Sequence, residues 1–360
     1  MLKYKLGEND GKSFFFNTNE NMNSQVVICG SSGSGKSTSG QYLLNQATEQ
    51  GTTVIAFDIH NVLDNQQISP QLRKKFYQNI NSIDVYNDGI SYPLFTPIVF
   101  SDGEVENITS MLDALTQTLA KPCKFGTRQK EALKSGIYKV YHSKAYEKDG
   151  FVALGDALDD IGTAKALEVK ERLSPLIDGN IFHHGFDFIK PGKINIFRLS
   201  KFPLDTQHMI SEIIINLIWK QAVQGAFSAT GVILFIDECH NLDTGKNGII
   251  SQILREGRRF NVHLILATQV LSTEAYMSKL MMQASLVLFF KPPKNEMAMV
   301  AKLIQPGNEE RWIGILANLS RGECIACGVL TLESGATYTR PLKITVKLEN
   351  EESNLSIVNK

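Results

Sequence analysis

The stretch from Gly30 to Ser37 constrains the fold of this chain more than any other part of its sequence. Its letters, GSSGSGKS, fit the pattern G-x-x-x-x-G-K-[ST]. A short apolar run from Gln25 to Cys29 precedes the pattern, and helix-forming sequence through Tyr42 to Leu44 follows it. We therefore predict a strand, a glycine-rich loop and a helix in that order, the context in which such a loop wraps around phosphate groups.

The residue types in this loop suit a nucleoside triphosphate. Glycines let backbone N–H groups turn toward the phosphates, and the following helix adds the positive end of its dipole. Lys36 is predicted to reach the β and γ phosphates, and the hydroxyl of Ser37 to contact Mg²⁺. We predict ATP and Mg²⁺ as cofactors. The predicted phosphate-binding residues are Gly30, Ser31, Ser32, Gly33, Ser34, Gly35, Lys36, Ser37 and Thr38.

A pair of acids follows a second apolar run, from Ile233 to Ile236. In open α/β sheets, ligands bind at the carboxyl ends of the strands, so Asp237 and Glu238 are predicted to face the nucleotide. Asp237 would hold the Mg²⁺ shell. Glu238 would polarise the attacking water as a catalytic carboxylate.

Two further strand ends carry polar residues. The apolar run Val262 to Ala267 leads into Gln269, which either senses the γ phosphate or caps a loop; the order of the strands favours the first interpretation. The run Val54 to Phe57 ends in Asp58, which we expect near the phosphates because that strand neighbours the glycine-rich loop.

The remaining pattern is that of an α/β protein. Continuous apolar runs, including Ser285 to Phe290, are typical of strands buried on both faces of a parallel sheet. Helical periodicity dominates from Glu104 to Gly185, which indicates a helical insertion into the core. The predicted divisions are residues 1–103 and 191–348 for the two parts of the core, 104–190 for the insertion and 349–360 for a flexible tail.

Composition excludes several classes of protein. Lys plus Arg and Asp plus Glu both total 37, so any contact with nucleic acid must be local. No apolar run approaches the ~20 residues that cross a bilayer, and no signal peptide is evident, which favours a soluble cytoplasmic protein without membrane insertion. Cys324 and Cys327 form one CxxC, but no second pair completes a zinc site.

The segment from Ile253 to Gln269, ILREGRRFNVHLILATQ, resembles the FtsK/HerA superfamily, whose members carry E-G-R-[KR] before the strand that ends in a sensor glutamine. With Gly30 to Ser37, Asp58 to His60 and Phe235 to Glu238, the resemblance covers most of the chain. It is closest to the HerA branch and the ATPases of conjugative transfer. It implies a RecA-like P-loop NTPase core of the additional-catalytic-glutamate (ASCE) type, with a mainly parallel sheet.

Members of that superfamily form hexameric rings around a DNA duplex, and an arginine of one subunit reaches the phosphates bound by its neighbour. The resemblance implies Arg258 or Arg259 as that arginine; a surface basic pair is the alternative. The chain departs from the pattern of HerA proteins, which usually begin with a β-barrel domain, because too few residues precede the glycine-rich loop. It also lacks the transmembrane helices of membrane-coupled relatives.

Two functions remain open from the sequence. The first is a ring-shaped motor that moves double-stranded DNA, with Lys246 in the glycine-rich stretch 241–248 as a DNA contact, unless that stretch is a plain surface turn. A nuclease or a membrane channel would be its partner. The alternative is a secretion-type ATPase that energises protein export. A slowly hydrolysing switch would need neither Glu238 nor Gln269.

Overall fold

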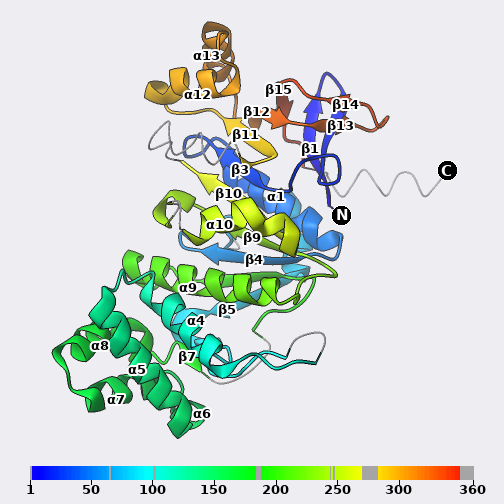
Figure 1. Ribbon diagram of the computed structural model, residues 1–360. Helices are drawn as coiled ribbons and strands as arrows, with labels where there is room; N and C mark the ends of the chain where they lie inside the picture. The colour runs from blue at the N-terminus through cyan, green and yellow to red at the C-terminus, as the bar shows by residue number, and fades with distance from the viewer. Residues whose placement is uncertain are drawn as a thin grey trace. The chain divides into compact units, whose positions relative to one another are not determined.

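The computed structural model describes residues 2–64, 66–99, 103–183, 188–243, 245, 248–269 and 283–348. The chain forms two compact units (Figure 1). The first comprises Met1–Asn81, Pro191–Asn195 and Ala229–Lys360, and the second comprises Ser82–Lys190 and Ile196–Ser228.

The first unit is built on parallel strands in the order β11-β3-β10-β9-β4. Nearly all of their residues are buried, because helices and loops cover both faces of the sheet. This arrangement confirms the predicted α/β class with a large, mainly parallel sheet. The strands are β3 (Val26–Cys29), β4 (Thr53–Asp58), β9 (Val232–Ile236), β10 (Val262–Thr268) and β11 (Leu286–Phe290).

Antiparallel strands extend this sheet beyond β11, in the order β12, β15, β1, β2, β13 and β14. Strands β1 and β2 form a hairpin through Asp10 and Gly11, both of which have positive φ angles, 46° and 74°. This hairpin is not among the elements predicted from the sequence. The strands are β1 (Lys3–Asn9), β2 (Lys12–Asn17), β12 (Glu323–Gly328), β13 (Leu330–Leu332), β14 (Thr337–Tyr338) and β15 (Leu342–Thr345).

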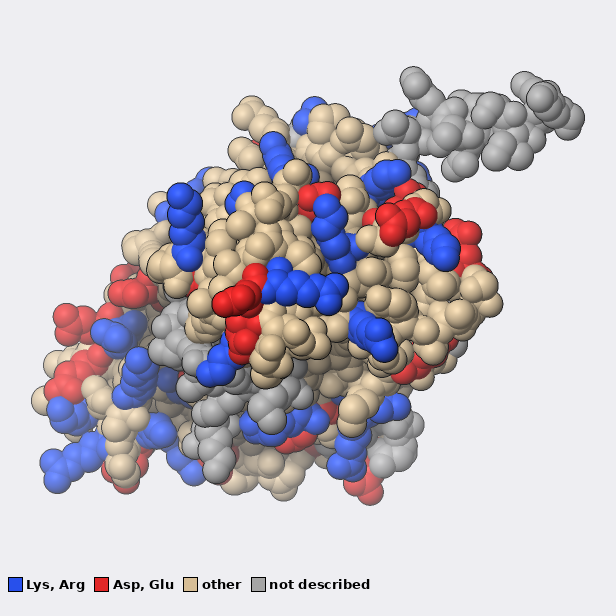
Figure 2. Space-filling model, turned by 90° about the horizontal axis from the view of Figure 1, so that it is seen from above, with Lys and Arg blue, Asp and Glu red and all other residues tan. Residues whose placement is uncertain are grey.

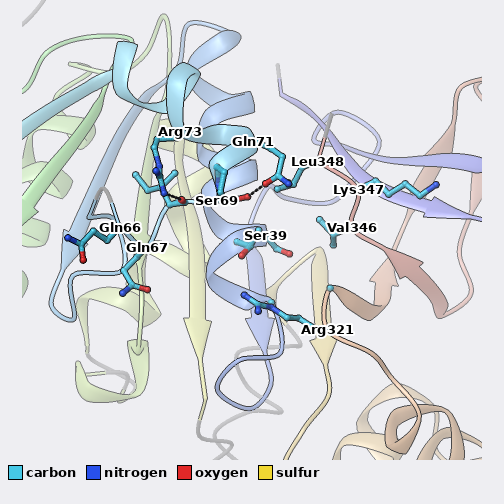
Figure 3. Close-up of a pocket in the computed structure, with 15 residues that line it drawn as sticks. Ser39, Gln66, Gln67, Ser69, Gln71, Arg73, Arg321, Val346, Lys347 and Leu348 are labelled. Atoms are coloured by element: carbon cyan, nitrogen blue, oxygen red, sulfur yellow. Dashed lines mark hydrogen bonds between the residues drawn. The ribbon is translucent and has the colours of Figure 1, made fainter. Parts of the chain in front are cut away.

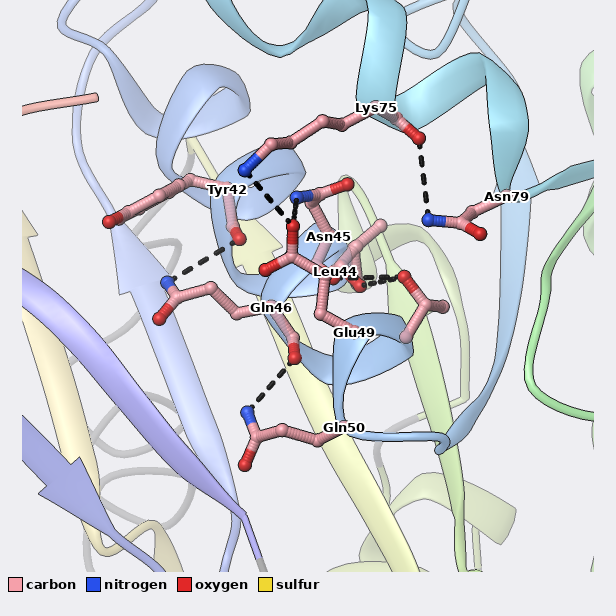
Figure 4. Close-up of polar contacts among 9 residues, drawn as sticks. Tyr42, Leu44, Asn45, Gln46, Glu49, Gln50, Lys75 and Asn79 are labelled. Carbon is pink, nitrogen blue, oxygen red and sulfur yellow. Dashed lines mark hydrogen bonds and ion pairs between the residues drawn. The ribbon is translucent and has the colours of Figure 1, made fainter. Parts of the chain in front are cut away.

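Helix α1 (Lys36–Glu49) starts at the glycine-rich loop and packs against β3, β4 and β10. Gly40 allows this close approach, since a Cβ atom there would lie 3.0 Å from the ring of Phe235 in β9. At the other end of α1, Glu49 accepts a hydrogen bond from Asn45 at 3.0 Å and pairs with Lys75 of α2 (Pro70–Gln78) at 3.4 Å (Figure 4). The helix that carries Lys36 is therefore anchored along its length.

The other helices of the first unit follow the strands β9 and β11. They are η1 (Cys239–Asn241), α10 (Ile249–Glu256), η2 (Gly257–Phe260), η3 (Lys294–Glu296), α12 (Met297–Ile304) and α13 (Glu309–Ala317). Gly257, the glycine of the E-G-R-R stretch, lies where a Cβ atom would come within 2.5 Å of the Val262 carbonyl oxygen. The turn from α10 into β10 therefore requires glycine at this position.

The second unit is mainly helical, and the apolar stripes predicted between residues 104 and 190 are buried in it. The unit begins at Ser82 and also takes in residues 196–228, so it is wider than the predicted insertion. Its helices are α3 (Val85–Asp88), α4 (Ile108–Ala120), α5 (Thr127–Ser143), α6 (Ala145–Asp149), α7 (Val152–Ile161), α8 (Ala164–Ile177) and α9 (Leu204–Val223). Strands β6 (Ile90–Ser91) and β7 (Phe182–His183) pair with each other.

Strands β8 (Ile194–Arg198) and β5 (Ile80–Asp84) continue the sheet order after β4, and the chain passes from one unit to the other within them. Among the described helices, none combines the length and the apolar character that crossing a bilayer demands. Lys and Arg side chains alternate with Asp and Glu on the face seen in Figure 2, as the equal charge totals suggest.

Candidate nucleotide-binding and active site

The register of the parallel strands brings the predicted site residues to one edge of the sheet. Phe57, Ile236 and Leu266 lie in one row across β4, β9 and β10, and Thr268 lies beside Cys29 of β3. The residues that end or follow these strands share the carboxyl edge of the sheet. They are Asp58 after Phe57, Asp237 and Glu238 after Ile236, Gln269 after Thr268, and Gly30 after Cys29.

The glycine-rich loop needs glycine because neighbouring segments come very close to it. Gly30 has a φ of 149°, and a Cβ atom there would lie 2.7 Å from the Cβ atom of Phe290. Gly35 has a φ of 113°, and its Cβ atom would lie 3.0 Å from the backbone nitrogen of Gly322. Larger residues at either position would displace the loop from its supports.

Hydrogen bonds from two later segments hold the loop. The backbone N–H and the hydroxyl of Ser31 both donate to the Lys291 carbonyl at the end of β11, at 2.9 and 2.8 Å. On the other side, the N–H of Gly322 donates to the Ser34 carbonyl at 2.9 Å. The glycine-rich loop is thus held in place by the segments at the end of β11 and at the start of β12.

Lys36 is buried at the start of α1, with only 5% of its surface exposed. Its ammonium group donates to the Ser31 carbonyl at 2.9 Å, so the charge points into the loop. Burial lowers the pKa of Lys36, while the negative charges of Glu238 and Asp237 oppose that shift. A lysine held in this way offers its positive charge to phosphates that enter the loop.

Asp237 and Glu238 bring two buried carboxyl groups to the same edge. Burial, followed by the charge of Glu238, raises the pKa of Asp237 to about 6. A divalent cation would offset this accumulation of negative charge, and a carboxylate with a hydroxyl is a donor set that Mg²⁺ accepts beside phosphate oxygens. Ser37 and Asp237 therefore fit the predicted metal-binding role.

Glu238 is fixed in an unusual conformation. Its φ and ψ angles are 52° and 47°, the left-handed region that residues other than glycine rarely adopt. Its carboxylate accepts hydrogen bonds from Gln269: the backbone N–H of Gln269 donates to Oε2 at 3.2 Å, and the side-chain amide donates to Oε1. The glutamine thus contacts the predicted catalytic acid directly, a pairing that the sequence does not reveal.

A cavity of about 690 Å³ opens beside the glycine-rich loop (Figure 3). Gly35, Thr38 and Ser39 line it on the side of the loop. Arg321 also lines it and extends toward α1 in Figure 3. The other walls are Gln66–Gln71 with Arg73, and Val346–Leu348. Arg73 and Arg321 cannot be predicted from the local sequence, because the wall of the cavity combines segments from distant parts of the chain.

The basic pair lies at the other edge of the sheet. Arg258 and Arg259 in η2 precede β10, whose seven residues span about 23 Å, and Gln269 follows that strand. Both arginines are exposed; Arg258 donates to the Met22 carbonyl, and Arg259 lies 5.3 Å from the ring centre of Phe260. Neither arginine belongs to the site formed by its own glycine-rich loop.

Lys246 lies outside the described residues. Cys324 and Cys327 are three residues apart on β12, so their side chains point to opposite faces of the strand. Within the described residues, no group of three or more His, Cys, Asp or Glu side chains could hold a metal ion.

Comparison with known proteins identifies the family. The model of the AAA-like domain matches residues 16–329, which contain the glycine-rich loop, the acidic pair and Gln269. The chain belongs to this FtsK/HerA-like family. The resemblance inferred from the E-G-R-R stretch is thereby confirmed.

A curated relative is the DNA double-strand break repair helicase HerA of Sulfolobus acidocaldarius, which is 22% identical over 355 residues. That match covers 92% of this chain but 66% of the relative. Among solved structures, VirB4 of Thermoanaerobacter pseudethanolicus superposes with a TM-score of 0.69 at 15% identity, over 98% of both chains. The plasmid coupling protein TrwB, in complex with ADP and Mg²⁺, gives 0.58 at 10% identity over 91% of this chain and 87% of that chain. These likenesses show a shared fold.

Proposed function

We propose that this AAA-like domain protein binds and hydrolyses ATP at the carboxyl edge of its parallel sheet. The proposal depends on one observation: Lys36, Asp237 and Glu238 interact electrostatically beside a glycine-rich loop that hydrogen bonds hold in place. Burying a charge is costly unless an opposite charge lies close to it. A nucleoside triphosphate with Mg²⁺ supplies both signs: its phosphates are negative, as Lys36 requires, and its metal is positive, as the two carboxylates require.

Each residue has a distinct task in the proposed reaction. Backbone N–H groups at the helix end of the glycine-rich loop and the ammonium of Lys36 bind the phosphates, and Ser37 with Asp237 would hold Mg²⁺. The metal, when bound, would neutralise charge on the phosphate oxygens. Glu238 accepts the proton of the attacking water, and Gln269 reports the state of the terminal phosphate to β10.

The cavity beside the loop is the proposed place for the base and ribose. It adjoins Gly35 and Thr38, where a bound triphosphate chain would end in its nucleoside. Arg73 and Arg321 contribute positive charge to its walls, and Val346 and Leu348 contribute apolar surface. This mixed lining suits a nucleoside, because the ribose is polar and the faces of the base are apolar.

We further propose that hydrolysis moves double-stranded DNA through a ring of subunits. Support comes from the HerA relative, whose name describes a DNA repair helicase, and from TrwB, described as a plasmid coupling protein. Because Arg258 and Arg259 lie at the far edge of β10, either could serve only the nucleotide of a neighbouring subunit. Arg259 keeps its guanidinium on the surface over Phe260 and is the better candidate.

The test is ATP hydrolysis by the full chain with and without linear duplex DNA. The account predicts hydrolysis that rises with added duplex, and a parallel shift from monomer to ring in the presence of nucleotide. Glu238→Gln serves as the inactive control. Hydrolysis that ignores DNA at every protein concentration would contradict the DNA motor and favour the alternative, an ATPase that energises protein export.

A further inference from the structure

The imidazole of His240 lies against the carboxylate of Glu238, at a place that the proposed reaction leaves without a role. Its Nδ1 atom is 3.4 Å from Glu238 Oε2 and 3.1 Å from the hydroxyl oxygen of Thr268. His240 belongs to η1, directly after β9, and Thr268 ends β10. The ring therefore bridges the ends of two neighbouring strands at the carboxyl edge.

The two oxygens of the Glu238 carboxylate have different partners. Oε1 accepts from the side-chain amide of Gln269, whereas Oε2 accepts from the Gln269 backbone N–H and lies beside His240. If the Gln269 side chain turns away, Oε1 becomes available and Oε2 keeps its partners. A carboxylate that is held at one oxygen can present the other to water in a defined direction.

The neighbouring carboxylate favours one position for the proton on the ring. A neutral imidazole carries one protonated and one unprotonated nitrogen, and an unprotonated Nδ1 would repel the lone pairs of Glu238 Oε2. A protonated Nδ1 instead donates to the Thr268 hydroxyl oxygen and brings its hydrogen toward Oε2, which lies 3.4 Å from Nδ1. The carboxylate therefore favours the tautomer with a hydrogen on Nδ1.

We propose that His240 is a positioning residue for hydrolysis: its Nδ1–H holds Oε2 of Glu238, so that Oε1 faces the attacking water once Gln269 releases it. The inference rests on the proposed role of Glu238 in ATP hydrolysis. The Gln269 side chain and His240 then have opposite effects on hydrolysis. The Gln269 amide occupies Oε1 and keeps it from water, whereas His240 holds Oε2 so that the free Oε1 is correctly oriented.

Two substitutions separate this role from a structural one. Asparagine places its amide nitrogen where His240 has Nδ1, whereas glutamine places an amide closer to the Nε2 position. We expect His240→Asn to keep kcat within about threefold of the wild type. His240→Gln and His240→Ala should lower kcat by roughly tenfold to a hundredfold, the range for losing a hydrogen bond to a charged group. KM and ATP-analogue binding should stay unchanged.

The control is His142→Ala, at an exposed position near the end of α5, which should leave all of these values unchanged. Equal activity of His240→Asn and His240→Gln, or an unchanged kcat in His240→Ala, would overturn the proposal.

The position of the proton on His240 can be measured without ATP hydrolysis, so this test does not depend on the proposed function. In the full chain with ¹⁵N-labelled imidazoles, we expect the His240 signal, identified by its loss in His240→Asn, to show a protonated Nδ1. Glu238→Gln should shift that signal, and His142→Ala should not. An unprotonated Nδ1 in the wild type contradicts the inference even if ATP is hydrolysed. Absence of ATP hydrolysis defeats the proposed function, and the ¹⁵N result then decides the inference.

Discussion

The two edges of the parallel sheet are formed by the same strands but bury different kinds of polar side chain. At the carboxyl edge, Lys36, Asp237 and Glu238 are buried charges with shifted pKa values or strained backbone. At the amino edge, the buried polar side chains are neutral and hydrogen bonded. Gln25, which is fully buried, accepts from the Leu264 N–H at 2.6 Å.

The neutral network at the amino edge continues through His263. The hydroxyl of Ser24 contacts Nδ1 of His263, and Nε2 of that ring lies 3.0 Å from the side-chain oxygen of Asn261. These groups join the beginnings of β3 and β10 without any net charge. The comparison teaches that buried charge in this sheet gathers at the edge where we propose that the nucleotide binds, whereas these polar groups of the opposite edge are neutral and hydrogen bonded.

The strongest challenge to this comparison is Glu238→Gln. Loss of the carboxylate removes the proposed base, so kcat should fall by about 10²–10⁴-fold while ATP binding is kept. Steady-state hydrolysis and binding of a fluorescent ATP analogue measure the two effects. Glu147→Gln, at an exposed position of α6, is the matched control. A Glu238→Gln protein that turns over at the wild-type rate would remove Glu238 from the mechanism.

Lys36→Ala tests whether the buried ammonium at the carboxyl edge serves a ligand rather than the fold. We expect ATP binding to weaken by roughly 10- to 100-fold, the range for losing a charge-assisted hydrogen bond. The melting temperature without nucleotide should not fall, because burial of this charge is costly. Lys148→Ala, at an exposed position of α6, should change neither value. A lower melting temperature of Lys36→Ala with unchanged ATP affinity would show that this ammonium group serves the fold and not a ligand.

Gln25→Ala sharpens the comparison from the amino edge. The substitution leaves the Leu264 N–H without its acceptor inside the protein, which should lower the free energy of unfolding by about 1–3 kcal/mol. Nucleotide affinity of the folded protein should be unchanged. Urea denaturation and analogue binding measure the two quantities. A loss of affinity with normal stability would show that the edges are not separate in function.

A further expected effect at the amino edge concerns pH. Burial lowers the pKa of His263 from 6.5 to about 4, so the unfolded chain binds a proton in this range that the folded protein does not. Stability from neutral His263 is present above pH 6.5 and is lost as pH falls toward 4. The slope from this group is at most about 1.4 kcal/mol per pH unit. His263→Gln should give a flatter stability profile between these values; an identical profile would contradict the prediction.

Local sequence patterns were enough to predict the carboxyl edge in outline. The glycine-rich loop, the acidic pair, Gln269 and the strands before them depend on residues that are adjacent in sequence. The contact between Gln269 and Glu238 requires the parallel register of β9 and β10. His240 lies three residues after Asp237 in the sequence. Its contact with Thr268 cannot be predicted locally, because Thr268 belongs to another strand, β10.

The β1–β2 hairpin was missed although its signal is local. Asp10 and Gly11 form a favoured two-residue turn, and buried residues alternate on both sides of it, with Tyr4 and Leu6 before and Phe14 and Phe16 after. The many asparagines nearby obscured that alternation. The cavity that Arg73 and Arg321 share was beyond sequence reasoning, since no local pattern predicts which distant segments meet.

The most direct test of the central claim is a structure of the full chain with Mg²⁺ and a non-hydrolysable ATP analogue. The account predicts the triphosphate on Gly30–Thr38, the metal held by Ser37 and Asp237, and Glu238 parted from the Gln269 side chain and facing the terminal phosphate. A nucleotide bound elsewhere, or a Glu238 that points away from the terminal phosphate in every assembled state, would contradict it.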